Sequence, residues 1–211
     1  MLKMTKAQIL AELLDTKIVA IIRLSNAKQV YQTAVALYEG GVKAIEVTVG
    51  TPNALQEIAK LAQHSGILPG VGSVVDAATC KAAIQAGAEF IVTPTTKKEV
   101  IEMAHSYGKP VMSGALTPTE ILQAYEWGAD IIKLFPAATF GLPYFKAVKA
   151  PMPYIPIMPT GGVTIENAAE WIENGAVCLG VGSTLVNKKL INNGDFEAIT
   201  VQARKMCEKV I

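Results

Sequence analysis

GADIIKLFP, residues 128–136, is the stretch that decides the fold, because it joins a helix stop to a short apolar strand. Gly128 suits the left-handed conformation in which many helices end. The apolar run that follows is typical of a buried strand. Lys133 lies inside this run, where burial disfavours an ammonium group that has no partner. The stretch therefore predicts both an element boundary and a lysine with an unusual environment.

A glycine followed at once by an apolar strand occurs four times in the chain. The four dipeptides are Gly41-Val42, Gly87-Ala88, Gly128-Ala129 and Gly175-Ala176. Successive glycines are 46, 41 and 47 residues apart (87 − 41, 128 − 87, 175 − 128), which is room for two strand–helix units each time. We therefore predict that these strands are the second, fourth, sixth and eighth.

Eight short apolar runs alternate with segments of helical periodicity. The runs are 17–22, 44–49, 66–75, 89–93, 110–113, 130–135, 155–159 and 176–181. Helical periodicity is clear in 27–39, 53–63 and 97–107, and the sequence TPTE at 117–120 has the pattern of a capping box. Such alternation predicts parallel strands, and eight units predict a (β/α)8 TIM barrel, in a single domain over 1–211 with an N-terminal helix. An open doubly wound sheet is the alternative.

Composition limits the classes of partner. The chain has 211 residues, of which 51% are hydrophobic and 18% charged, so it can bury a large core. Its formal net charge of +1 gives no electrostatic reason to expect nucleic acid or an anionic membrane as a partner. We find no apolar run long enough for a membrane span and no signal-peptide pattern. Cys80, Cys178 and Cys207 show no CxxC spacing, so we expect reduced thiols and a cytoplasmic protein.

The glycine repeat also predicts which residues share a layer. Five residues after each glycine stand Glu46, Val92, Lys133 and Gly180. In a barrel, each interior layer is drawn from alternate strands. We therefore expect Glu46 and Lys133 to point into the barrel interior at similar height, near its C-terminal mouth. A register shift of one residue would turn either side chain outward.

A glutamate and a lysine in one layer have two interpretations. They can form a buried salt bridge, and for Lys133 taken alone a pairing or solvent-reaching role is the plainer one. Alternatively, a lysine that has lost its proton is a nucleophile that forms a Schiff base with a carbonyl substrate. Glu46 would then move protons beside the imine, and Arg23, at the end of the first strand, would supply a nearby positive charge.

Two glycine-rich loops follow the seventh and eighth strands. The first contains Gly161 and Gly162, and the second contains Gly182 and Ser183. TIM barrels often bind phosphate with these two loops, through backbone N–H groups. Ordinary glycine turns are the alternative, since a GGV sequence alone is weak evidence, but two such loops at the two expected places favour a phosphate site.

Metal chemistry is not expected. The chain has two histidines, His64 and His105, and both fall in helical segments of the outer shell. A metal-dependent barrel enzyme would need several histidines at strand ends. We therefore predict neither a metal nor another cofactor.

Seven motifs together resemble the 2-keto-3-deoxy-6-phosphogluconate (KDPG) aldolase family, which includes 4-hydroxy-2-oxoglutarate aldolases. They are 17–23, 46–48, 72–74, 116–120, 133–136, 159–163 and 180–183, in the family's order over nearly the whole chain. The resemblance implies that Lys133 is the Schiff-base lysine and Glu46 the general acid/base, acting through water. It also implies a metal-free homotrimer that cleaves KDPG to pyruvate and glyceraldehyde 3-phosphate.

The resemblance assigns further residues to the substrate. Those matching the phosphate-binding positions are Arg23, Gly161, Gly162, Gly182 and Ser183. Ser73 matches a threonine that contacts the pyruvate part, and Thr48, Phe135 and Thr160 lie within the matched motifs as further substrate-binding candidates. Gly50 stands where many members have an arginine that binds the pyruvate carboxylate. This departure leaves open a 4-hydroxy-2-oxoglutarate or 2-keto-3-deoxy-6-phosphogalactonate aldolase.

Two hypotheses from other classes are kept beside the aldolase. A sugar-phosphate isomerase or epimerase on the same barrel would need catalytic groups other than Lys133. A phospho-ligand binder without activity would keep the glycine-rich loops and turn over no substrate. Substrate turnover and its dependence on Lys133 separate the three.

Overall fold

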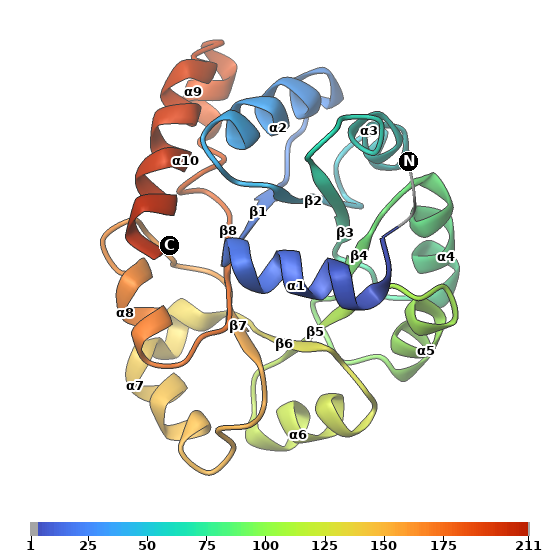
Figure 1. The fold of residues 1–211 in the computed structure, drawn as a ribbon, viewed down its shortest axis with the longest axis vertical. Helices are drawn as coiled ribbons and strands as arrows, with labels where there is room; N and C mark the ends of the chain where they lie inside the picture. Colours follow the sequence, from blue (N-terminus) through green and yellow to red (C-terminus); the bar gives the residue numbers. More distant parts are fainter. Residues whose placement is uncertain (1–3, 211) are drawn as a thin grey trace.

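The computed structural model describes residues 4–210, in which eight parallel strands form the centre and the helices surround them (Figure 1). The strands are β1 Ile18–Ile22, β2 Ala44–Thr48, β3 Leu68–Gly72, β4 Phe90–Val92, β5 Val111–Ala115, β6 Ile131–Leu134, β7 Ile157–Pro159 and β8 Leu179–Val181. The helices are α1 Lys6–Thr16, the 3-10 helix η1 Ala27–Gln29, α2 Val30–Glu39, α3 Ala54–Leu61, α4 Ala77–Ala86, α5 Lys98–Ser106, α6 Pro118–Glu126, α7 Ala137–Lys149, α8 Ala168–Glu173, α9 Lys188–Asn192 and α10 Phe196–Val210.

The sheet closes on itself. Its strand order is β7-β6-β5-β4-β3-β2-β1-β8, with every pair parallel. A bridge between Thr160 and Gly180, directly beyond the end of β7 and within β8, joins the two outer strands. The predicted (β/α)8 barrel is therefore confirmed, and the open doubly wound sheet is wrong.

Local sequence signals explain where the helices end and begin. Gly41, Gly87, Gly128 and Gly175 all have φ between 91° and 113°, the left-handed region that glycine tolerates. The strands that follow them are β2, β4, β6 and β8, as the repeat predicted. Thr117 caps α6 with a complete capping box. The predicted helix over 27–39 differs in its first turn, which is the 3-10 helix η1.

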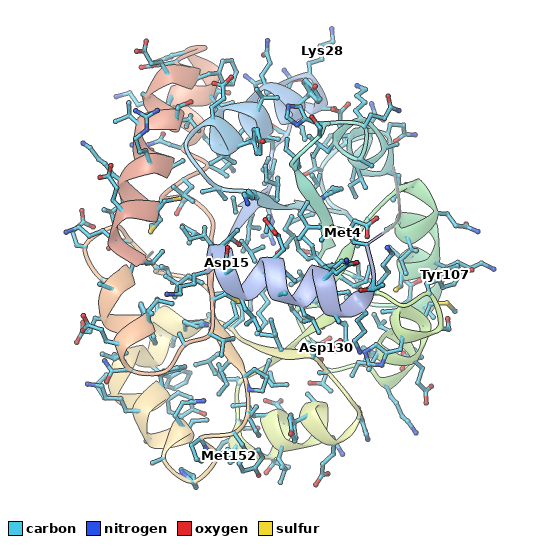
Figure 2. All side chains as sticks on the ribbon, viewed as in Figure 1. Met4, Asp15, Lys28, Tyr107, Asp130 and Met152 are labelled. Carbon is cyan, nitrogen blue, oxygen red and sulfur yellow. The ribbon has the colours of Figure 1, made fainter. Side chains whose placement is uncertain are left out.

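The N-terminal helix α1 closes one end of the barrel, across which it lies in Figure 1. Ile9 and Leu13 of this helix are fully buried, and they share one apolar cluster with interior side chains such as Phe90. Lys6 of α1 also forms an ion pair of 2.7 Å with Asp130, and Figure 2 shows Asp130 beside this helix. Because α1 covers the N-terminal ends of the strands, the opposite end is the one left for a ligand.

No helix within residues 4–210 has the length and apolar character needed to cross a membrane.

Candidate active site

Strand alternation directs Lys133 into the barrel. Its neighbours Ile132 and Leu134 pack in the cluster between strands and helices, whereas Ile131 belongs to the interior cluster. Because successive side chains on a strand point to opposite faces, Lys133 shares the interior face with Ile131. It is 6% exposed, and no salt bridge within residues 4–210 includes it. The Lys133 Nζ atom lies 5.4 Å from the centre of the Phe135 ring, so its immediate neighbour is an aromatic face.

Glu46 is directed inward for the same reason. Ile45 and Val47 pack outward in the cluster between strands and helices, and the Glu46 side chain between them is fully buried. Neither of its carboxylate oxygens has a hydrogen-bond partner among the described residues. Burial raises the pKa of this carboxyl, and the positive charges of Lys133 and Arg23 act in the opposite direction. A raised pKa brings the carboxyl closer to conditions in which it both accepts and donates a proton.

Gly72, at the end of β3, makes the room that Glu46 occupies. A Cβ atom added at Gly72 would lie 1.6 Å from Glu46 Oε1, far closer than any real contact. The φ angle of Gly72 is not in the left-handed region, so the space, and not the backbone conformation, requires glycine here. The position of the Glu46 carboxylate therefore depends on the missing side chain at residue 72.

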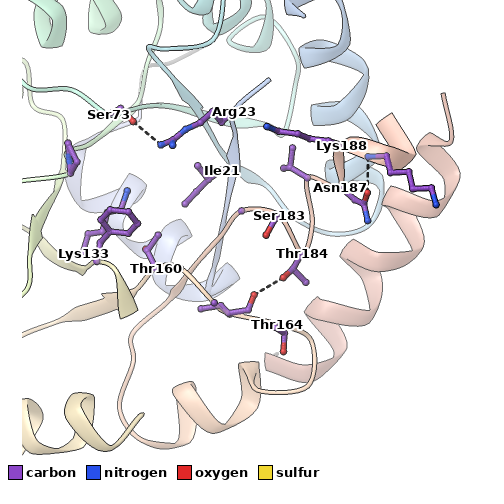
Figure 3. A pocket seen from close by; sticks show the side chains of 18 residues that line it. Ile21, Arg23, Ser73, Lys133, Thr160, Thr164, Ser183, Thr184, Asn187 and Lys188 are labelled. Carbon is purple, nitrogen blue, oxygen red and sulfur yellow. Dashed lines mark hydrogen bonds between the residues drawn. The ribbon is translucent and has the colours of Figure 1, made fainter. Parts of the chain in front are cut away.

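A cavity of about 730 Å³ opens at the C-terminal ends of the strands (Figure 3). Nine of the eleven residues that the sequence suggested for the site line it: Arg23, Ser73, Lys133, Phe135, Thr160, Gly161, Gly162, Gly182 and Ser183. Glu46 lies below the lining, fully buried. Thr48 does not reach the cavity, because it is 1% exposed and its hydroxyl lies 3.3 Å from that of Thr51. The structure thus gives no support to Thr48 as a direct substrate contact.

The two glycine-rich loops form one side of this cavity. Gly161 and Gly162 have φ angles of 93° and 74°, which permit the backbone to turn its N–H groups toward the opening. A Cβ atom at Gly162 would lie 2.3 Å from that of Ala138, so glycine is also required by close packing. From the neighbouring strand, Arg23 Nη2 donates a hydrogen bond of 3.4 Å to Ser73 Oγ. Backbone donors and a guanidinium group at one end of a cavity suit an anionic ligand.

Sequence reasoning missed part of the lining. Pro94, beyond β4, and Ile21, on β1, border the cavity, and so do residues of the segment that follows Ser183, namely Thr184, Val186, Asn187, Lys188 and Lys189. The alternation on β1 could have identified Ile21, since Arg23 is two residues away on the same face. The contribution of the later segment was not foreseeable from the glycine motif, which ends before it.

The two histidines lie away from this cavity lining. His105 Nε2 is 2.9 Å from Asp130 Oδ2, in the ion-paired group beside α1. His64 packs edge-on against Tyr38, with ring centres 5.1 Å apart. Within residues 4–210 no cluster of three or more histidine, cysteine or acidic side chains could hold a metal ion.

Comparison with known proteins identifies the relatives of this chain. The family model "KDPG and KHG aldolase" matches residues 9–202. A 2-dehydro-3-deoxy-phosphogluconate aldolase of Pseudomonas aeruginosa is 33% identical over 198 residues, which cover 92% of this chain and 90% of the relative. A 2-dehydro-3-deoxy-6-phosphogalactonate aldolase of Escherichia coli K12 is 36% identical over 171 residues, covering 80% and 83%.

Solved structures agree with this relationship. The crystal structure of a KDPG aldolase from Legionella pneumophila superposes with a TM-score of 0.86 at 27% identity, covering 93% of this chain and 97% of that one. That crystal structure holds pyruvate captured as a covalent carbinolamine intermediate. The likeness extends over the whole barrel and is not limited to the site.

Proposed function

The chain belongs to the KDPG and KHG aldolase family, and from that premise we propose that it is a class I aldolase whose Schiff base forms on Lys133. The proposed substrate is a 2-keto-3-deoxy-6-phospho sugar acid, foremost KDPG, which is cleaved to pyruvate and glyceraldehyde 3-phosphate. The observation that carries the proposal is the convergence of two inward side chains. Lys133 is buried without an acidic partner, and Glu46 is a buried carboxyl with a raised pKa.

The first half of the proposed reaction builds an electron sink. The neutral amine of Lys133 adds to the C2 ketone of the substrate and gives a carbinolamine. Glu46, acting through a water molecule, protonates the departing hydroxyl, and loss of water leaves an iminium ion. The inward direction of Glu46 and the effect of the nearby Lys133 charge on its pKa support this role.

The second half breaks the carbon–carbon bond. Glu46, directly or through water, removes the proton of the C4 hydroxyl, and the C3–C4 bonding electrons move toward the iminium nitrogen. The aldehyde leaves and an enamine remains on Lys133. A proton is then added at C3, and water hydrolyses the iminium to pyruvate and the free amine. Glu46 therefore acts as base and acid in turn, for which its raised pKa is suited.

The other end of the cavity is proposed to hold the substrate phosphate. Its candidate ligands are the backbone N–H groups of the loops with Gly161, Gly162, Gly182 and Ser183, together with the Arg23 guanidinium. Phe135 and Thr160 also line the cavity, Phe135 with its ring centre 5.4 Å from Lys133 Nζ, and are proposed to border the carbon chain. Ser73 is proposed to contact the pyruvate part. The relatives named as KDPG and phosphogalactonate aldolases support a phosphorylated 2-keto acid and make the galactonate epimer the main competing substrate.

We further propose one aldolase domain that assembles as a homotrimer in the cytoplasm. Exposed Phe140 and Tyr154, at 50% and 59% of their full accessibility, offer apolar surface for subunit contacts. Cys80 and Cys178 are buried free thiols, which is consistent with a reducing compartment. Light scattering measures the mass in solution, and a monomeric mass at micromolar concentration would remove the trimer.

Trapping with borohydride tests the Schiff base. Incubation with pyruvate and borohydride should add one reduced pyruvate to the protein, and peptide mapping should locate it on Lys133. The Lys133→Met variant should show no adduct. An internal control is Lys109, a second buried lysine at 7% exposure, which is ion-paired with Glu89 and should stay unmodified. An adduct that persists in Lys133→Met would overturn the proposal.

A substrate panel tests the phosphate role. We expect kcat/KM for KDPG to exceed that for the unphosphorylated analogue, because only KDPG engages the glycine-rich loops. The galactonate epimer and 4-hydroxy-2-oxoglutarate complete the panel. Equal kcat/KM with and without the phosphate would remove the phosphate site, while the lysine chemistry would still stand on the trapping experiment.

A further inference from the structure

The ionisable side chains that line the cavity are all basic. The lining contains four cationic side chains, Arg23, Lys133, Lys188 and Lys189, and no aspartate or glutamate. Lys133 is proposed above as the nucleophile and Arg23 as a phosphate ligand, so two lysines on one short segment have no assigned role. A phosphate monoester carries close to two negative charges at neutral pH, of which one guanidinium balances about one. A second cation is therefore expected at the phosphate end.

Lys188 is positioned to be that cation. Figure 3 shows its side chain extending toward the base of Arg23, whose guanidinium group points on toward Ser73, and both residues line the same cavity. Arg23 is held on its own side by the hydrogen bond to Ser73. Because both side chains line one cavity, an anion bound at its mouth would lie in the positive field of both groups.

The backbone around Lys188 is fixed to the glycine-rich loop after β8. The Val186 N–H donates to the Gly182 carbonyl at 2.8 Å, which folds the segment after Ser183 into a tight turn. Asn187 then caps α9, since its Oδ1 accepts hydrogen bonds from the N–H groups of Lys189 and Leu190 at 3.0 and 3.3 Å. The base of the Lys188 side chain is therefore held near the N–H groups proposed to bind phosphate.

We propose that Lys188 is a further substrate-binding residue, whose ammonium group, together with the Arg23 guanidinium, neutralises the two negative charges of the substrate phosphate. This inference rests on the proposed function for its ligand, a phosphate monoester, and adds a residue that the glycine motifs do not contain. Lysine acts here as a point charge on a flexible stem, so it strengthens binding without fixing the orientation of the carbon chain.

Steady-state cleavage of KDPG and of its unphosphorylated analogue is the first test. Lys188→Met keeps most of the side-chain stem and removes the charge. We expect it to raise KM for KDPG by about two- to fivefold with little change in kcat, as for an exposed charge pair, and to leave the unphosphorylated analogue unaffected. Lys188→Arg should stay near wild type. The dependence of kcat/KM on salt should also be weaker in Lys188→Met, because one screened cation is missing.

Lys189→Met is the matched control. Its residue type, exposure and segment are the same, but adjacent helix residues point in different directions. We expect it to change KM for KDPG less than about twofold. Equal effects of Lys188→Met and Lys189→Met on KDPG would overturn the inference, since only a general surface charge would then be at work. An equal loss on both substrates in Lys188→Met would also overturn it.

Calorimetric titration with inorganic phosphate separates this inference from the proposed function. We expect wild type and Lys189→Met to bind phosphate with similar affinity and Lys188→Met to bind it less tightly. If the protein cleaves no aldol but this difference is found, the proposed function fails and the anion site stands. If it cleaves KDPG and the three affinities are equal, Lys188 has no part in the site.

Discussion

Replacing Gly72 by alanine tests whether the position of Glu46, apart from its chemical identity, controls turnover. The new Cβ atom would lie 1.6 Å from Glu46 Oε1, 2.3 Å from its Cδ and 2.6 Å from its Cγ. All three distances are below the closest approach of real carbon contacts, and β3 is held to β2 by the Thr48–Gly72 register. The carboxylate, and not the strand, must therefore move.

The geometry sets the size of the effect. To restore an ordinary contact of about 3.4 Å, Glu46 Oε1 must withdraw by more than 1 Å. A displacement of about 1 Å costs roughly 100-fold in a reaction that depends on orientation, and a general acid/base contributes about 10²–10⁴-fold. We therefore expect kcat to fall at least about 100-fold. Overpacking should also lower the free energy of unfolding by about 1–3 kcal/mol.

Two assays on Gly72→Ala distinguish a displaced Glu46 carboxylate from an unfolded protein. Steady-state cleavage of KDPG measures kcat, and borohydride trapping with pyruvate measures whether Lys133 still forms an imine. We expect Gly72→Ala to lose turnover while it keeps trapping with pyruvate, although more slowly. The matched control is Gly50→Ala at the end of the neighbouring strand, where an added Cβ atom has nothing within 4 Å and φ is not in the left-handed region.

A kcat within threefold of wild type in Gly72→Ala would refute this reasoning, since Glu46 would then work from another position. Loss of the pyruvate adduct together with an unfolded circular dichroism spectrum would show that the variant lost its fold, and Glu46→Gln would then carry the test. A comparable loss in Gly50→Ala would show that any change at this mouth lowers turnover.

Three further predictions concern stability. Burial raises the pKa of Glu46 in the folded protein above its value in the unfolded chain. At a pH below the unfolded pKa the carboxyl is protonated in both states and costs the fold nothing. As pH rises toward the folded pKa, the unfolded chain gains stability by ionising, so the free energy of unfolding falls. The Tm of Glu46→Gln minus that of wild type should therefore grow in calorimetry as pH rises above the unfolded pKa of a glutamate, about 4.3, and a constant difference would contradict the raised pKa. Asp130→Ala should lower the free energy of unfolding in urea by about 1–3 kcal/mol, because Lys6, His105 and the Val111 N–H lose their acceptor at the closed end. It should leave kcat unchanged. Thr117→Ala removes the capping box made with Glu120 and should cost about 1 kcal/mol, a fall in Tm of roughly 2–4 °C, with a rise in Tm counting against the cap.

The barrel could be predicted because its signals are local. Gly87 and Gly128 end helices through a conformation that other residues rarely adopt, and the strand then starts at the next residues. Equal offsets from Gly41 and Gly128 were enough to bring Glu46 and Lys133 to one interior face, although they are 87 residues apart (133 − 46). Such an inference works in a barrel because strand alternation and closure leave few arrangements.

The absence of Thr48 from the cavity lining and the presence of Lys188 in it could not be predicted, because both depend on turns. Thr48 shares the inward alternation of β2, but the chain bends after it, and its hydroxyl meets Thr51 before it reaches the cavity. Lys188 enters the cavity mouth only because the segment after Ser183 folds back through the Val186–Gly182 hydrogen bond. Neither turn has a sequence signal as strong as a glycine stop.

The closed end of the barrel holds stabilising contacts, and the open end holds the side chains proposed for the chemistry. At the closed end, apolar side chains of α1 fill the interior, and the half-buried Asp130 carboxylate has a lysine, a histidine and a backbone N–H around it. Toward the open end, the Glu46 carboxylate accepts no hydrogen bond from residues 4–210, although it is the more deeply buried of the two. A buried carboxylate without protein hydrogen bonds opposes folding, which favours a chemical role for Glu46 over a structural one. If that function is proton transfer to and from a bound substrate, Glu46→Gln should gain stability and lose turnover together, whereas a purely structural Glu46 would lose both.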